Sequence, residues 1–121
     1  HLQGLDQLQY NEPYLVICSS LKDALCLKQF GYNVEVIAPD SENTIIKPYI
    51  IENLKSKYKK VITLFDNDTA GHAAINKYLL HFNIKGFYLT LSKDLSDAVC
   101  EFGFDKVHVE LKELLSKTLK L

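Results

Sequence analysis

The feature that most constrains the fold is a regular alternation of short apolar runs with segments of helical periodicity. Four runs of five or six residues are rich in aliphatic and aromatic side chains, and polar residues or a turn follow each of them. Short apolar runs of this kind are typical of strands buried on both faces of a parallel sheet. The predicted strands cover residues 14–19, 34–38, 61–65 and 86–91.

The segments between and after these runs repeat apolar residues at the spacing of one helical face. Gly31 and Gly103 stop two of them, as glycine often does just beyond a helix. The predicted helices cover residues 20–30, 46–57, 68–82, 94–102 and 106–119. In the third of these, the residues expected to face the core are Ala70, Ala73, Ala74, Tyr78 and Leu79.

Strands that alternate with helices through short connections predict an α/β, Rossmann-like fold, in which a four-stranded, mostly parallel sheet carries helices on both faces. A chain of 121 residues that is 47% hydrophobic has the apolar content for one such domain, which we expect to cover 13–121. Residues 1–12 lack the pattern and are predicted to be the linker tail of a preceding region. We therefore expect other domains in a longer chain.

Charge and composition argue against a strongly basic nucleic-acid-binding protein, a membrane-spanning protein and a zinc-binding protein. The net charge of −1 gives no overall positive field, and all 14 basic residues are lysines, so nucleic acid would have to be bound through metal, lysine or backbone groups. No apolar run approaches the roughly 20 residues of a membrane span. The three cysteines form no Cys-x-x-Cys pair, which argues against zinc and favours the reducing cytoplasm.

Carboxylates gather after the predicted strands, at the edge of the sheet where α/β proteins bind ligands. They are Asp23 after the first strand, Asp40 and Glu42 after the second, Asp66 and Asp68 after the third, and Asp94 and Asp97 after the fourth.

The sharpest local signal is the sequence Asp66-Asn67-Asp68-Thr69-Ala70-Gly71. Two carboxylates so close together raise each other's cost of ionisation unless a cation lies between them, and Mg²⁺ or Mn²⁺ suits such a site. Gly71 would allow backbone or substrate to approach closely. Helix capping by Asp68 is the competing explanation, and the carboxylates of the other strand ends favour metal.

Two lysines accompany these carboxylates. Lys93 precedes Asp94, and Lys22 precedes Asp23; both could meet phosphate as point cations. Each position also has a structural explanation, because Ser20 to Asp23 has the spacing of a capping box and aspartates are favoured at helix N-termini. His72 is expected to face solvent, with phosphate contact as the alternative.

At these residues the chain resembles the toprim family, which is shared by bacterial-type primases, topoisomerases and some nucleases and recombination proteins. The family pattern is Glu-Gly after the first strand, an Asp at fixed spacing, and Asp-x-Asp after the third strand. Asp66 and Asp68 match the last element and Asp23 the second. Lys93-Asp94, followed by Asp97, is similar to a Lys-Asp-rich motif of primases and primase-helicases.

The resemblance covers roughly residues 13–104, with one departure. Ser19 and Ser20 stand where the family has Glu-Gly, and a serine hydroxyl cannot accept a proton as a carboxylate does. Glu42 is the hypothetical replacement. Residues 20–23 and 38–44 resemble a subgroup found in phage and mobile-element primases.

The resemblance implies a primase or primase-helicase domain that performs Mg²⁺-dependent nucleotidyl transfer, with a single-stranded DNA template and nucleotides as partners. It implies catalytic roles for Asp66, Asp68, Asp94 and Lys22, ligand contacts for Lys93 and Gly71, and metal ligands among Asp66, Asp68, Asp94, Asp97 and Glu42. The alternatives are a degenerate module that binds metal and nucleic acid without chemistry, a toprim nuclease, and a receiver domain of the response-regulator kind.

Overall fold

The structure is a computed structural model that describes residues 2–3, 12–39 and 46–119. In those ranges it contains the strands β1 (Leu2–Gln3), β2 (Tyr14–Cys18), β3 (Val34–Pro39), β4 (Lys60–Leu64) and β5 (Gly86–Phe87). The helices are α1 (Leu21–Lys28), α2 (Pro48–Lys57), α3 (Thr69–Phe82), α4 (Leu95–Phe102) and α5 (Phe104–Leu119).

The strands form one sheet in the order β1-β3-β2-β4-β5. Strands β2 to β5 run parallel, and the short β1 pairs antiparallel with β3, with Leu2 opposite Pro39. The predicted α/β fold with a mostly parallel sheet is confirmed. Because β3 and β4 lie on opposite sides of β2, the chain leaves the ends of β2 and β4 in different directions, and this edge is a switch point of the topology.

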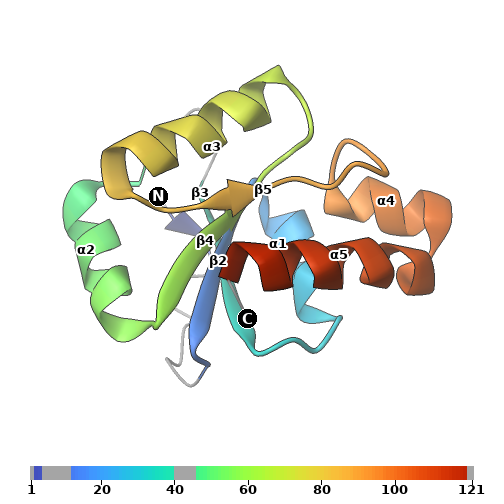
Figure 1. The fold of residues 1–121 in the computed structure, drawn as a ribbon, viewed down its shortest axis with the longest axis horizontal. Coiled ribbons are helices and arrows are strands. Elements are labelled where there is room, and N and C mark those ends of the chain that lie inside the picture. The colour runs from blue at the N-terminus through green and yellow to red at the C-terminus, as the bar shows by residue number, and fades with distance from the viewer. Residues whose placement is uncertain (1, 4–11, 40–45, 120–121) are drawn as a thin grey trace.

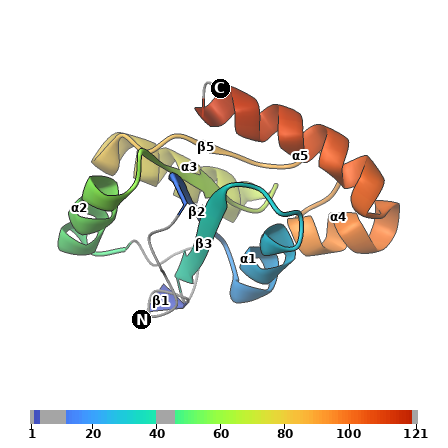
Figure 2. The same ribbon diagram turned by 90° about the horizontal axis from the view of Figure 1, so that it is seen from below.

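Helices cover both faces of the sheet, as Figures 1 and 2 show. Alternate residues of β2 point to opposite faces of the sheet and belong to two apolar clusters. Val16 and Cys18 pack with residues of α1, α4 and α5, and Leu15 and Ile17 pack with residues of α2 and α3. Most of the side chains in both clusters are almost fully buried. Among the described helices, none combines the length and apolar character needed to cross a bilayer.

The last predicted strand is much shorter than expected. Only Gly86 and Phe87 pair with β4, because β4 ends at Leu64 and leaves the following residues without a partner strand. The backbone N–H of Thr90 is bonded instead to the Glu110 carboxylate of α5.

The core-facing side of the third helix is the predicted one only in part, because Ala74 and Tyr78 are buried as expected and the other three predicted residues are not. Its buried residues are Gly71, Ala74 and Tyr78, while Ala70, Ala73 and Leu79 are exposed. The cause is the glycine: a Cβ built at Gly71 would lie 1.9 Å from the carbonyl oxygen of Asp66. Because Gly71 has no side chain, the first turn of α3 can pack directly against the backbone of Asp66, and this contact puts Gly71 on the buried side of the helix.

Candidate functional site

Three carboxylates meet at the carboxyl end of the sheet, beside the switch point between β2 and β4. Asp66 follows β4, Asp23 lies in the first turn of α1, and Asp94 immediately precedes α4. One oxygen from each of the three lies within 4.8 Å of the others. The fold thus gathers acidic side chains from three segments that are far apart in the sequence.

Asp23 is the most deeply buried of the three, with only 4% of its surface exposed. Its Oδ1 accepts hydrogen bonds from the backbone N–H and the hydroxyl of Ser96, at 3.1 and 2.8 Å. Its own backbone N–H donates to the Ser20 hydroxyl, which caps α1. These contacts join the first turn of α1 to the first turn of α4 and hold the carboxylate in place.

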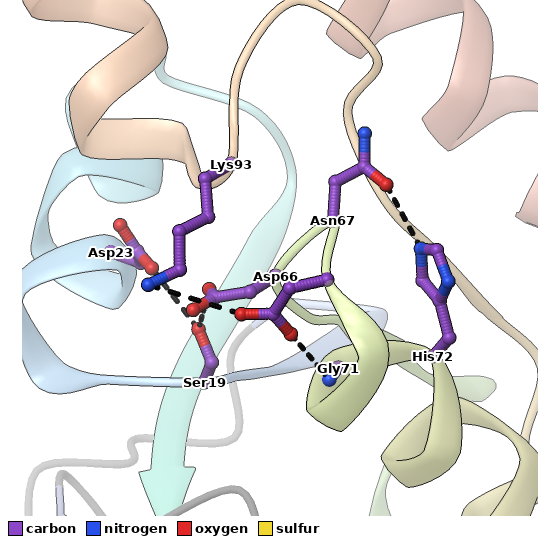
Figure 3. A network of polar contacts seen from close by, with 8 residues as sticks. Ser19, Asp23, Asp66, Asn67, Gly71, His72 and Lys93 are labelled. Atoms are coloured by element: carbon purple, nitrogen blue, oxygen red, sulfur yellow. Dashed lines mark hydrogen bonds and ion pairs between the residues drawn. The ribbon is translucent and has the colours of Figure 1, made fainter.

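Ser19, the first residue after β2, lies between two of the carboxylates (Figure 3). Its hydroxyl is 2.6 Å from Oδ1 of Asp66 and 3.1 Å from Oδ2 of Asp23. Ser19 is itself buried. A serine at this position therefore links the two carboxylates and adds no negative charge to them.

Asp94 has two roles in the structure. Its side chain accepts a 2.8 Å hydrogen bond from the backbone N–H of Asp97 and caps α4. A carboxylate oxygen of Asp94 also lies within 4.8 Å of the carboxylate oxygens of Asp23 and Asp66. The side chain of Asp97 is exposed. Lys22 is exposed at the start of α1, close enough for its charge to lower the pKa of Asp94.

Asp68 lies at the rim of the group. Its Oδ1 accepts a 2.7 Å hydrogen bond from the backbone N–H of Gly71, and its Oδ2 lies 3.9 Å from Nζ of Lys93. Asp68 is thus the N-cap of α3, which was the competing explanation from the sequence. The lysine side chain extends toward the carboxylates, as Figure 3 shows, and brings a positive charge to their edge.

The electrostatics of the group oppose its full ionisation. Burial raises the pKa of Asp66, the nearby charges of Asp23, Asp94 and Asp68 raise it further, and the hydrogen bond from Ser19 lowers it. Burial also raises the pKa of Asp94, against the lowering effect of the Asp97 N–H. A cation bound among these carboxylates would remove much of this repulsion.

The donor set fits a hard divalent cation. All three side chains offer carboxylate oxygens, which Mg²⁺ and Mn²⁺ prefer, and no cysteine or histidine takes part in the described group. Mg²⁺ commonly uses one or two carboxylates and keeps several waters. Three carboxylates that are partly buried and close together meet this requirement.

The structure brings together only part of the predicted site. Asp66 and Asp94 share the carboxylate group, and Asp68, Lys93 and Lys22 lie around it. Glu42 lies outside the described residues, so its hypothetical role stays a prediction. The N–H of Gly71 is bonded to Asp68, and its lack of a side chain serves the close contact with Asp66.

Sequence reasoning did not place Asp23 among the metal ligands. The capping-box spacing explained this residue, and Ser20 does cap α1, but the Asp23 carboxylate bonds to Ser19 and Ser96, so the capping signal concealed a second role for the side chain. Its match to the Asp that follows Glu-Gly in the family pattern was the signal that pointed to the site. Ser96, which holds Asp23, gave no signal in the sequence.

Comparisons with known proteins identify the family and a similar fold. The sequence profile of the Toprim-like family matches residues 16–99, which is more than half of the chain. The fold is similar to the crystal structure of the Aquifex aeolicus primase (zinc-binding and RNA polymerase domains), with a TM-score of 0.66 and 23% sequence identity. The match covers 93% of this chain and 29% of the primase chain, so the chain spans less than a third of that protein's length. No curated protein matches the sequence.

Proposed function

The chain belongs to the Toprim-like family, and on that premise we propose that it is the toprim domain of a DNA primase or primase-helicase. In this proposal it acts in the cytoplasm on a single-stranded DNA template and nucleotides, together with other domains of a longer chain. Its reaction is magnesium-dependent nucleotidyl transfer for primer synthesis.

The observation that carries the proposal is the group formed by Asp23, Asp66 and Asp94 at the switch point of the sheet. Buried like charges of this kind destabilise a fold unless a cation or a proton offsets them. A site of carboxylates with lysines at its rim suits a metal ion that carries nucleotide phosphates. The fold shared with a primase supports the same conclusion.

In this proposal each residue of the site has a role that follows from its chemistry. When bound, Mg²⁺ supplies the positive charge that activates the primer 3′-hydroxyl and neutralises the leaving pyrophosphate. Asp66 and Asp94 would hold the ion, and Asp23 would be its third carboxylate ligand. Asp68 and Asp97 lie at the rim and support the site, and Gly71 keeps the Asp66 backbone within close packing distance of α3.

Lys22 and Lys93 provide positive charge at the edge of the site. Lys93 lies 3.9 Å from Asp68 and is largely exposed, so its ammonium group can exchange the carboxylate for a phosphate oxygen. Ser19 cannot take a proton as a carboxylate would, so it orients Asp66 and Asp23. Ser19 is therefore not the base that takes the proton of the 3′-hydroxyl.

The experiment that tests the proposal incubates the protein with single-stranded DNA, nucleotides and Mg²⁺ or Mn²⁺, and then looks for extension, cleavage or neither. We expect short primers from the wild type. The double variant Asp66→Asn, Asp68→Asn should lose activity by about 100-fold or more, the scale on which removal of a transition-state charge contact acts. Primer synthesis that survives in this variant would refute the proposal.

A matched control tests whether the loss of activity is specific to the site or follows from the loss of any aspartate charge. Asp105 is exposed in the first turn of α5, and Asp105→Asn should leave primer synthesis unchanged. Cleavage of the DNA in place of extension would indicate a toprim nuclease. Metal binding with neither product would indicate a module that binds without chemistry.

A further inference from the structure

Two exposed aromatic rings that contact each other have no part in the proposed metal site. His72 lies in the first turn of α3, and Tyr88 directly follows β5. Their ring centroids are 4.4 Å apart and their planes are inclined by 38°. His72 is exposed and Tyr88 is 38% exposed, whereas the core pair Phe65 and Tyr78 is almost fully buried.

The histidine ring is held in place by the same loop that carries the carboxylates. A ring nitrogen of His72, Nε2, lies 2.9 Å from the side-chain oxygen of Asn67. Asn67 stands between Asp66 and Asp68, and its backbone N–H donates a 2.6 Å hydrogen bond to the carbonyl of Lys93. Figure 3 shows Asn67 and His72 on the side of this loop away from Ser19 and Asp23. The hydrogen bond ties the histidine ring to the loop between Asp66 and Asp68, and the ring of Tyr88 packs against it.

The helix dipole does not explain the histidine. The first turn of a helix favours negative groups, so a histidine there contributes nothing through the helix dipole. The matching histidine at the other end of α3, His81, lies in the last turn, where a positive charge is favoured. An exposed ring pair that is oriented by a hydrogen bond is a surface on which a flat group can stack, and little entropy is lost because the rings are already fixed.

We propose that His72 and Tyr88 form a stacking platform for a nucleobase whose phosphate lies at the carboxylate site. This inference rests on the proposed function and names the part of the substrate that the site contacts beyond its phosphates. Every base has a flat π-face, so stacking tolerates any sequence. The absence of arginine removes the usual bidentate contact to guanine, so we expect little preference among bases.

The test compares two oligonucleotides of equal length in Mg²⁺ without nucleotides: oligo-dT and an abasic strand with the same phosphates. Stacking of one base contributes about 5- to 150-fold in affinity, which is 1–3 kcal/mol. We expect the wild type to bind oligo-dT more tightly by a factor in this range. Tyr88→Ala should remove the difference and leave binding of the abasic strand unchanged, while Tyr88→Phe should keep it.

A histidine pair provides the matched control. His72→Ala should weaken binding of oligo-dT, and His81→Ala, a change of the same residue type on the same helix, should not. Repeating the titrations with a free nucleoside triphosphate distinguishes the source of the base. A loss for oligo-dT in Tyr88→Ala indicates a template base, and a loss for the triphosphate indicates the incoming nucleotide.

Photo-crosslinking gives a second measurement that does not depend on a variant that folds. A strand carrying 5-iodouracil should crosslink to the wild-type peptides that contain His72 or Tyr88. A wild type that binds oligo-dT and the abasic strand equally, or binds neither, overturns the platform, and so does crosslinking confined to other peptides. These measurements involve no primer synthesis. The stacking platform can therefore be refuted while primer synthesis is observed, and base stacking can be observed while primer synthesis is absent.

Discussion

The hydroxyl of Ser19 lies 2.6 Å from Oδ1 of Asp66 and connects the end of β2 to the end of β4. The same hydroxyl lies 3.1 Å from Oδ2 of Asp23. A serine has one hydroxyl hydrogen, so two acceptors share one donor. Ser19 therefore fixes the separation of two carboxylates that would otherwise repel each other.

The first expected outcome concerns this hydroxyl. Ser19→Ala leaves the buried carboxylate of Asp23 with one partner fewer, and an unsatisfied buried acceptor costs about 1–3 kcal/mol. Urea unfolding in metal-free buffer should detect this loss of stability. Ser56→Ala is the control, because Ser56 is exposed and its hydroxyl bonds to the carbonyl of Asn53 in the preceding turn of the same helix. Equal stability of the two variants would show that the Ser19 hydroxyl does not support the site.

The second concerns pH. Burial and the neighbouring charges raise the pKa of Asp66 in the folded chain. The folded state then binds this proton more tightly than the unfolded state, so stability falls as pH rises from the ordinary carboxyl pKa, about 4, through the raised value. Asp66→Asn should therefore be more stable than the wild type in metal-free buffer at neutral pH.

The advantage of Asp66→Asn should shrink as the pH approaches about 4, where the wild-type carboxyl is protonated as well. Urea titrations of both proteins across this range measure it. A difference that is independent of pH, or a variant that is less stable at neutral pH, would contradict the electrostatic description of the group.

The third concerns the metal. A ligand that binds only the folded state stabilises it by about 2.7 kcal/mol at 100 times its Kd, which for a domain of this size raises Tm by roughly 10 °C. We expect Mg²⁺ or Mn²⁺ to raise the wild-type Tm on this scale and EDTA to reverse it. The shift should disappear in Asp94→Asn. A wild-type Tm that stays unchanged on addition of Mg²⁺ and of Mn²⁺ would argue against a metal site.

The fourth concerns the approach of α3 to the end of β4. Replacing a helical glycine by alanine usually stabilises a protein by up to about 1 kcal/mol. Gly71→Ala should do the opposite, because the new Cβ would lie 1.9 Å from a backbone oxygen of Asp66 that cannot move aside. We expect a loss of about 1–3 kcal/mol or more in urea unfolding.

A change at an exposed position of the same helix checks that the effect is steric. Ala73→Ser lies on the solvent side of α3 and should stay within about 0.5 kcal/mol of the wild type. A Gly71→Ala variant as stable as Ala73→Ser would mean that α3 does not pack on Asp66 this closely.

Much of the fold could be predicted from the sequence because its signals are local. The apolar runs of β2, β3 and β4 are visible in the sequence, and the observed strands differ from the predicted ones by one residue at one end, or at both ends for β4. The strand predicted at 86–91 begins where expected but is shorter for a non-local reason: its pairing ends where β4 ends, and no pattern within the segment itself indicates the length of the neighbouring strand.

The site was harder to predict because one side chain can satisfy two patterns. Asp68 and Asp94 cap helices, and Asp94 also joins the carboxylate group. Asp23 matched a capping box, yet its carboxylate is turned toward Ser96, 73 positions away in the chain. Spacing along the chain identifies a cap, whereas only the packing of α1 against α4 brings Asp23 to the site.

The most direct test of the central claim is a Mn²⁺ titration followed by electron paramagnetic resonance, which distinguishes free from bound ion. If Asp23, Asp66 and Asp94 hold the metal, the wild type should bind Mn²⁺, and Asp66→Asn should bind it at least about 10-fold more weakly, a loss of 1.4 kcal/mol. Asp105→Asn, on the exposed start of α5, should bind as the wild type does. Unchanged Mn²⁺ binding in Asp66→Asn would contradict the claim.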